Sequence, residues 1–267
     1  MTEQEYRQHP AVSRSELFRI LDSPEKFRYF KDNPEPPTPA LIFGQVFHKL
    51  ALQPESFSDD FAVAPQCDRR TREGKMLWSE FTEQSEGKTI ISADDFAVAN
   101  EMCTALRNVP QAIKLLTGEK EKPFFWTDDM TGEQCKCRVD CLSDVTVNDS
   151  VVVVDVKSAA NADYDSYIRD AIKYGYDFQA AWYTNGVTIC TGRPCIFVFI
   201  VVEKTPPYAV NIFQADPFLM RRGGDLYREA LGIYHDCNTT GNWYGYLGKF
   251  NQINNLSLPA WLAKEYE

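Results

Sequence analysis

The sequence predicts a mixed α/β fold, in which helices flank one mixed β-sheet and further helices form an N-terminal layer. Helical periodicity dominates residues 1–116, and a β-rich, alternating pattern with turn signals occupies residues 121–158. A helix, two more strands and a last helix follow. The 267 residues are 44% hydrophobic and 25% charged, as in an ordinary globular protein. We expect one domain with a mostly helical part (about 1–116), a core (about 117–237) and a docked tail (238–267).

The first forty residues predict short helices and a proline-rich link. Ser13 or Ser15 can cap a helix that runs through Leu21, because a serine oxygen accepts from the free N–H groups of the first turn. Pro24 stands at the first helical position of the next segment, where its missing N–H leaves no hydrogen bond unmade. The prolines within residues 33–39 exclude a helix interior there.

The remaining elements follow from apolar periodicity. Helices are predicted over residues 41–52, 68–84, 94–116, 163–183 and 216 to about 237. Strands are predicted over residues 122–128, 134–144, 151–157, 195–203 and 208–214. The continuous apolar run Val151–Val154 indicates a strand that is buried on both faces. The tail is expected to dock because it carries large apolar residues, namely Trp243, Tyr244, Tyr246, Leu256 and Trp261.

The composition excludes several classes of protein. The chain has 28 basic and 38 acidic residues, and this net charge of −10 excludes a generally basic nucleic-acid-binding surface but not a local basic groove. No apolar run approaches the roughly 20 residues of a membrane-spanning helix. The polar, acidic N-terminus is unlike a secretory signal, so the eight cysteines are expected as reduced thiols. We expect a cytoplasmic protein without membrane association.

The strongest chemical signal is the end of the buried strand that contains Asp155 and Lys157. Residues two apart in a strand share a face, so these two side chains point the same way and Val156 points the other way. Asp140 lies one strand earlier, and a hairpin of this length can bring Asp140 and Asp155 to the same edge of the sheet. Two carboxylates can hold Mg²⁺ or Mn²⁺, and a lysine can orient water and offset charge on a phosphate. The alternative is a structural ion pair on a surface hairpin.

Two more segments carry polar candidates. Gln179 and Tyr183 are four residues apart on the next predicted helix, so they share a face and can both reach a phosphate or a water. The alternative is a solvated glutamine and a core tyrosine. His48 is one of three histidines, and the sequence leaves the direction of its side chain open.

Taken in order, these residues resemble a known family. The set Gly44-x3-His48, Asp140, Asp155-x-Lys157 and Gln179-x3-Tyr183 is similar to the PD-(D/E)xK nuclease superfamily, in the branch of RecB-type nuclease domains and phage-type exonucleases. The similarity to RecE-type exonucleases spans roughly residues 10–235. Its supporting segments are Ser13–Leu17, Ser23–Phe27, Ala40–His48, Asp68–Lys75, Thr131–Asp140 and Val202–Lys204.

The resemblance implies a restriction-endonuclease-like fold and a role for each residue. Asp140, Asp155 and the Val156 carbonyl would bind a metal, with His48 as a ligand or a support for bound water. Lys157 would be the catalytic lysine, and the substrate would be positioned by Gln179 and Tyr183. Relatives commonly have proline before the first acid, where this chain has Val139. An extra acidic contact could come from Glu121, although Glu119 nearby leaves that choice open.

The implied activity is that of a Mg²⁺- or Mn²⁺-dependent exodeoxyribonuclease that hydrolyses linear double-stranded DNA, 5′→3′, in phage-type recombination. The resemblance also implies binding to DNA ends, a single-strand-annealing partner protein, and a homo-oligomeric ring such as a tetramer. Three alternatives remain: a structure-specific or cluster-dependent nuclease of the superfamily, a DNA-end-binding protein that no longer cuts, and an unrelated α/β domain. Intact Asp140, Asp155 and Lys157 argue against a retired site, because buried charges are costly without a function.

The cysteines and the basic segments give weaker signals. Cys135, Cys137 and Cys141 would share a strand face, which fits the packing of small thiols, and we expect no iron–sulfur cluster. The basic segment before residue 76 offers candidates for DNA-backbone contacts, against the alternative of a solvated helix start. These candidates are Arg69, Arg70, Arg72 and Lys75. The pair Arg221 and Arg222 is a second, weaker candidate.

Overall fold

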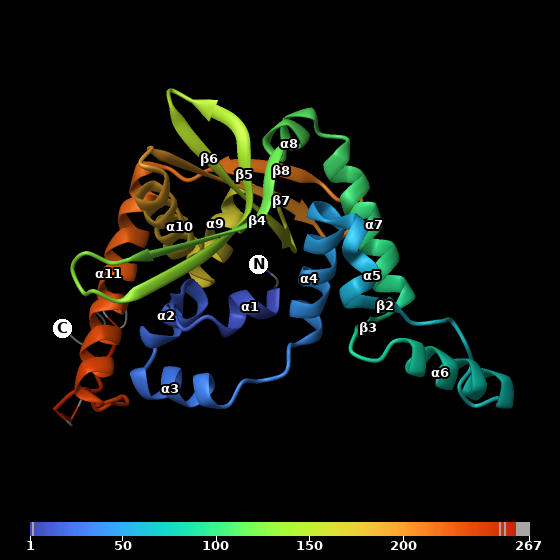
Figure 1. The fold of residues 1–267 in the computed structure, drawn as a ribbon, viewed down its shortest axis with the longest axis horizontal. Coiled ribbons are helices and arrows are strands. Elements are labelled where there is room, and N and C mark those ends of the chain that lie inside the picture. The colour runs from blue at the N-terminus through green and yellow to red at the C-terminus, as the bar shows by residue number, and fades with distance from the viewer. Residues whose placement is uncertain (2, 251, 254, 260–267) are drawn as a thin grey trace.

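A mixed six-stranded sheet forms the centre of the structure (Figure 1). In this computed structural model, residues 1, 3–250, 252–253 and 255–259 are described. The strands are β1 (Val12–Ser13), β4 (Gly118–Thr127), β5 (Gln134–Val147), β6 (Ser150–Ala159), β7 (Cys195–Glu203) and β8 (Val210–Gln214). The order is β1-β5-β6-β7-β8, and β4 pairs with β5. Strands β6 and β7 are parallel, whereas β4–β5, β5–β6 and β7–β8 are antiparallel.

The hairpin between β5 and β6 is closed by a two-residue turn. Asn148 and Asp149 have φ values of 47° and 62°, and asparagine and aspartate tolerate this left-handed conformation better than most residues. The turn sets the register, in which Val147 pairs with Ser150. The run Val151–Val154 is buried on both faces, as its sequence predicts.

Helices cover both faces of the sheet and divide the core into two clusters (Figure 1). One cluster contains Phe178 and Trp182, and the other contains Val46 and Met102. The first face packs against α2 (Arg14–Ile20), α3 (Pro24–Asp32), α9 (Tyr164–Lys173), α10 (Tyr176–Thr191) and α11 (Pro217–Thr240). The second face packs against α4 (Pro39–Leu52), α7 (Ala93–Arg107) and α8 (Pro110–Leu115). The predicted α/β class with a mixed sheet between helices is confirmed.

A small appendage extends from the second face. Helix α5 (Phe57–Asp60), which follows a 3₁₀ turn (Pro54–Ser56), leads into β2 (Phe61–Val63), and β2 pairs in parallel with β3 (Thr89–Ile91). Between these strands the chain runs out to α6 (Arg72–Gln84), which projects from the body (Figure 1). Within the described residues, no helix has the length and apolar character needed to cross a bilayer.

Two predicted long helices are each broken into two. Residues 94–116 form α7 and α8, because Pro110 lacks the N–H that a continuous helix needs and instead starts a new one. Residues 163–183 form α9 and the start of α10, because Gly175 adopts a left-handed φ of 65° that ends the first helix. The sequence analysis also missed strands β1, β2 and β3, which have two or three residues each and too short a pattern to detect.

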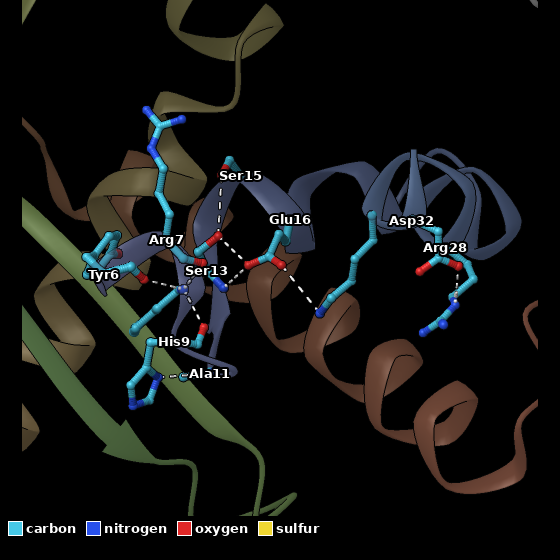
Figure 2. A network of polar contacts seen from close by, with 11 residues as sticks. Tyr6, Arg7, His9, Ala11, Ser13, Ser15, Glu16, Arg28 and Asp32 are labelled. Carbon is cyan, nitrogen blue, oxygen red and sulfur yellow. Dashed lines mark hydrogen bonds and ion pairs between the residues drawn. The ribbon is translucent and has the colours of Figure 1, made fainter. Parts of the chain in front are cut away.

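The N-terminal helix α1 (Glu3–Gln8) is held by a buried lysine of β5. Lys136 is buried, and its ammonium donates to the carbonyl oxygens of Tyr6 at 2.8 Å and His9 at 2.7 Å. Ser13 and Glu16 then form a capping box at the start of α2, as Figure 2 shows. This contact fixes the chain that leads into α2 beside β5.

The first residues of the tail, 243–246, lie against α3 and the turn before it. The ring of Trp243 stacks on Phe27 at 5.3 Å, and the hydroxyl of Tyr246 donates to Asp22 at 3.1 Å. Leu256 is exposed, and Trp261 lies outside the described residues.

Adjacent glycines in α11 give a matched test of how α10 and α11 pack. A Cβ on Gly223 would lie 2.0 Å from the carbonyl oxygen of Asp177, whereas a Cβ on Gly224 would meet nothing within 4 Å. We expect Gly223→Ala to lower the free energy of unfolding by roughly 1–3 kcal/mol through overpacking. Gly224→Ala should raise it by about 0.5–1 kcal/mol through helix propensity. Urea unfolding of both variants measures this difference, and equal effects would contradict the close packing.

Candidate active site

The two central carboxylates lie where β5 and β6 stop pairing. The antiparallel ladder ends at Cys141 and Val154, one residue short of Asp140 and Asp155. Beyond this point the side chain of Asp140 bridges the strands, since its Oδ2 accepts the backbone N–H of Val156 at 2.8 Å. The structure therefore brings Asp140 and Asp155 to neighbouring positions on adjacent strands.

His48 and Glu121 complete one side of this cluster. His48 Nε2 lies 2.8 Å from Asp140 Oδ2, and its Nδ1 lies 3.4 Å from Glu121 Oε1. The ligand atoms of His48, Glu121 and Asp140 all lie within 4.8 Å of one another. Arg138 Nε contacts the second oxygen of Glu121 at 2.8 Å. The sequence left Glu119 and Glu121 undecided, and the structure places Glu121 in the cluster, whereas Glu119 is exposed.

The other side of the cluster is formed by Asp155, Lys157 and Gln179. Asp155 is only 1% exposed, and the Lys157 ammonium contacts its Oδ2. The side-chain amide of Gln179, which comes from α10, donates to Oδ1 of the same carboxylate. The ammonium also lies 4.9 Å from the centre of the Tyr176 ring. The buried carboxylate is thus held by one hydrogen bond and one ion pair from different elements, while its Oδ2 has no hydrogen-bond partner.

Burial and mutual repulsion shift the pKa values of the acids. Burial and the nearby Asp140 raise the pKa of Asp155 to about 6, although Lys157 opposes this. Burial likewise raises the pKa of Glu121 to about 7. Burial disfavours the charged form of His48, but Asp140 and Glu121 outweigh this and raise its pKa to about 9. The acids therefore repel one another strongly, and a bound cation would relieve that repulsion.

The donor set fits a hard divalent cation. His48, Glu121 and Asp140 offer one imidazole and two carboxylates, with Asp155 and the Val156 carbonyl as the further ligands expected from the sequence. Glu121 Oε1 is buried and has no hydrogen-bond partner, although a cation would satisfy it. Oxygen-rich sites of this kind suit Mg²⁺ or Mn²⁺.

Tyr183 lies one turn after Gln179 on α10, against the ring of Phe197. Burial raises the pKa of its phenol far above the ordinary value, and the charges of Asp155 and Asp140 add to this effect. Tyr183 therefore stays protonated at neutral pH.

Sequence reasoning missed Arg14, the first residue of α2. Its guanidinium donates to the carbonyl oxygens of Tyr174 and Gly175, while its Nε is buried without a hydrogen-bond partner. Burial lowers the pKa of Arg14, and the charges of Tyr183 and Asp155 partly offset this effect. Segment 13–17 supported the family resemblance, but no pattern in it pointed to a role for Arg14, because the flanking serines suggested only a helix cap.

The predicted DNA-backbone contacts lie elsewhere. The structure places Arg69, Arg70, Arg72 and Lys75 at the start of the projecting α6 segment, outside the carboxylate cluster. The guanidinium of Arg222, the second candidate segment, contacts the buried Asp177. Their part in DNA binding stays a prediction.

The three cysteines of β5 do not share one face, which corrects the sequence interpretation. Cys135 and Cys137 pack in the core cluster beneath α10, whereas Cys141 packs in the cluster beneath α4 and α7. The inward-facing side of β5 changes near Asp140, and the facing residue of β4, Glu121, has a left-handed φ of 52°. This backbone irregularity reverses the alternation on which the prediction depended.

Comparison with known proteins places the chain in a family. A family model described as a PDDEXK-like domain of unknown function (DUF3799) matches residues 13–255. The chain belongs to this family. A DUF3799 domain is PDDEXK-like, which agrees with the mixed sheet and with the acidic cluster at its edge.

A solved structure resembles this DUF3799 chain in fold. A crystal structure of a protein from Eubacterium rectale, described as a putative exonuclease, is similar with a TM-score of 0.60 and 13% identity, over 97% of this chain and 96% of that one. A crystal structure of SSO0001 matches with a TM-score of 0.38 and 10% identity, over 86% and 81%. No curated protein matches the sequence. At this level of identity, the likeness to the Eubacterium rectale protein shows a shared fold.

The cluster predicts stabilisation by divalent metal. Mn²⁺ or Mg²⁺ at ten times Kd should raise the free energy of unfolding by about 1.4 kcal/mol, because the cation binds only the folded chain. Asp140→Asn should abolish the shift in thermal midpoint, and EDTA should reverse it. Glu119→Gln, a matched change at the neighbouring exposed acid, should leave the shift intact. An equal shift in wild type and Asp140→Asn would contradict a metal site here.

Proposed function

We propose that this chain is a metal-dependent exodeoxyribonuclease that hydrolyses the phosphodiester bonds of linear double-stranded DNA. The observation that carries the proposal is the buried Asp155, which contacts Lys157 and neighbours Asp140 at the point where two strands separate. His48 and Glu121 add further donors on the same edge. A bound divalent metal would supply a Lewis acid for the phosphate and lower the pKa of a water.

The other residues of the cluster would stabilise charge and orient the carboxylates. Burial disfavours the charged form of Lys157, but Asp155 and Asp140 outweigh this and raise its pKa, so the ammonium stays protonated. In that form Lys157 donates a hydrogen bond and offsets charge that develops on the phosphate, instead of removing a proton. Gln179 orients Asp155, and His48 orients Asp140.

The finer assignments depend on the resemblance to RecE-type exonucleases. They are the 5′→3′ direction, the preference for duplex ends, a role in phage-type recombination, a cytoplasmic location, a homo-oligomeric ring and a single-strand-annealing partner. The acidic chain requires local cations for a polyanionic substrate, and Lys157 and Arg14 near the carboxylates supply them.

The decisive experiment is digestion of linear duplex DNA, labelled at the 5′ or the 3′ end, with Mg²⁺, Mn²⁺ or EDTA. We expect metal-dependent release of nucleotides from linear DNA and none from closed circles, with the order of label release giving the direction. Lys157→Ala should lower kcat at least about 100-fold, because it removes a donor aimed at the developing charge.

The matched control is Lys249→Ala. Lys249 follows α11, is exposed, and pairs with Asp236 of that helix. Its kcat should equal that of the wild type. If the wild type binds DNA ends but releases no nucleotides with either metal, the protein is an end-binding scaffold and the proposed hydrolysis is wrong.

Arg14 should contribute to substrate binding. Arg14→Met removes a partly exposed cation whose charge acts on the pKa of Asp155, so KM for duplex DNA should rise roughly tenfold or more, in keeping with a charged hydrogen bond. Arg14→Lys should recover part of this loss if charge is what matters. Arg19→Met, on the exposed side of the same helix, is the control. An unchanged KM in Arg14→Met would reduce Arg14 to a support of the Gly175 turn.

A further inference from the structure

Lys204, which directly follows β7, is a partly exposed cation without an acidic partner. Its ammonium forms no ion pair within the part of the chain that the structure describes, and it lies 5.5 Å from the centre of the Phe43 ring on α4. The adjacent carboxylate of Glu203 is engaged elsewhere, since its Oε1 accepts the backbone N–H of Ala162 at 2.9 Å. A cation that is partly removed from water is costly without a counter-charge, and an anionic ligand would supply one.

The backbone fixes Lys204 close to the end of β6 that carries Lys157. The N–H of Lys204 donates to the carbonyl oxygen of Ala159 at 3.0 Å, and Ala159 pairs with Glu203 in the parallel ladder. Ala159 lies two residues after Lys157, which is about 7 Å farther along the strand. Lys204 is therefore anchored just beyond the carboxylate cluster, at the same end of the sheet.

Gly44 gives α4 an open surface next to Phe43. It stands four residues before His48, so the two residues share a face of the helix about 6 Å apart along its axis. Gly44 is partly exposed, and a Cβ at this position would meet nothing within 4 Å. The packing of the chain therefore does not require a glycine here, although glycine weakens a helix interior.

Both features fit a phosphate group that neighbours the reacting one along a DNA strand. A strand of a duplex carries one phosphate per about 3.4 Å of helix axis, so the next one or two phosphates fall at about the distance between His48 and Gly44. A helix face without a side chain lets a sugar–phosphate backbone approach closely. The ammonium of Lys204 would then provide the counter-charge for the phosphate.

We propose that Lys204 and the face of α4 that carries Gly44 bind a backbone phosphate of DNA, one or two nucleotides from the phosphate at the carboxylate cluster. We call this pair of residues the flanking-phosphate subsite. The inference rests on the proposed action on DNA and adds a binding contact to it. A contact with the backbone carries no base information, so the subsite gives no sequence preference. The contact is equal before and during hydrolysis, so its loss should raise KM and leave kcat unchanged.

The test is binding of a fluorescently labelled linear duplex, followed by anisotropy with Ca²⁺ in place of Mg²⁺ over roughly 50–200 mM NaCl. Lys204→Met keeps an apolar side chain against Phe43 and removes the charge. It should raise Kd roughly tenfold, as expected for a charged hydrogen bond. It should also lower the slope of log Kd against log salt concentration by about 0.9, the value for one phosphate contact. Lys204→Arg should restore both quantities.

Gly44→Ala separates DNA binding from stability. Alanine favours a helix over glycine and its Cβ has open space, so the thermal midpoint should rise by about 1–3 °C. Kd for the duplex should nevertheless rise about threefold or more, because the methyl group holds the DNA backbone away. Gly232→Ala is the matched control, since Gly232 of α11 is also partly exposed and its Cβ would also meet nothing within 4 Å. It should raise the midpoint without changing Kd.

The charge control is Lys249→Met, which should keep the Kd and the salt slope of the wild type. An unchanged salt slope in Lys204→Met would overturn the subsite even where the wild type cleaves DNA. Equal Kd values for Gly44→Ala and Gly232→Ala would likewise remove α4 from it. A wild type that binds the duplex through Lys204 but releases no nucleotides with Mg²⁺ or Mn²⁺ would support the subsite and contradict the proposed hydrolysis. A wild type that binds no duplex would overturn both.

Discussion

The burial of Asp155 is the constraint on which the rest of the site depends. A carboxylate that is 1% exposed costs several kcal/mol unless donors compensate it. Compensation comes from Lys157 on the same strand and from Gln179 on α10. The neighbouring Asp140 needs His48 from α4. The compensation of these buried charges therefore constrains the relative positions of β6, α10 and α4. For this reason the residues of this small site come from elements spread along the chain.

The same requirement explains which parts of the fold the sequence could predict. Alternation over five residues placed Asp155 and Lys157 on one face, because strand periodicity is local. The breaks at Pro110 and Gly175 were missed, although both residues are visible in the sequence, because apolar periodicity continues across them. Strand β1 has only two residues and pairs with β5 across more than a hundred positions, and local patterns carry no information about such pairing.

Local spacing in the sequence predicted some residues of the site and could not predict others. Gln179 was found by its spacing from Tyr183, and the structure places it against Asp155. The choice between Glu119 and Glu121 could not be made by alternation, because the left-handed backbone at Glu121 reverses the face of the strand. The role of Arg14 could not be predicted for a different reason. Its contacts are to the backbone of residues 174 and 175, and such contacts leave no pairwise signature in a sequence.

The charge distribution of this chain limits how strongly it could bind a polyanion. A net charge of −10 suppresses nonspecific attraction to DNA, so the proposed DNA binding would depend on local cations. Lys157 and Arg14 are both only partly exposed, and a partly buried cation interacts more strongly with a phosphate than a fully exposed one does. Binding would then be local to the site and weak along the duplex. A single chain of this kind would therefore release its proposed substrate readily between cleavage events.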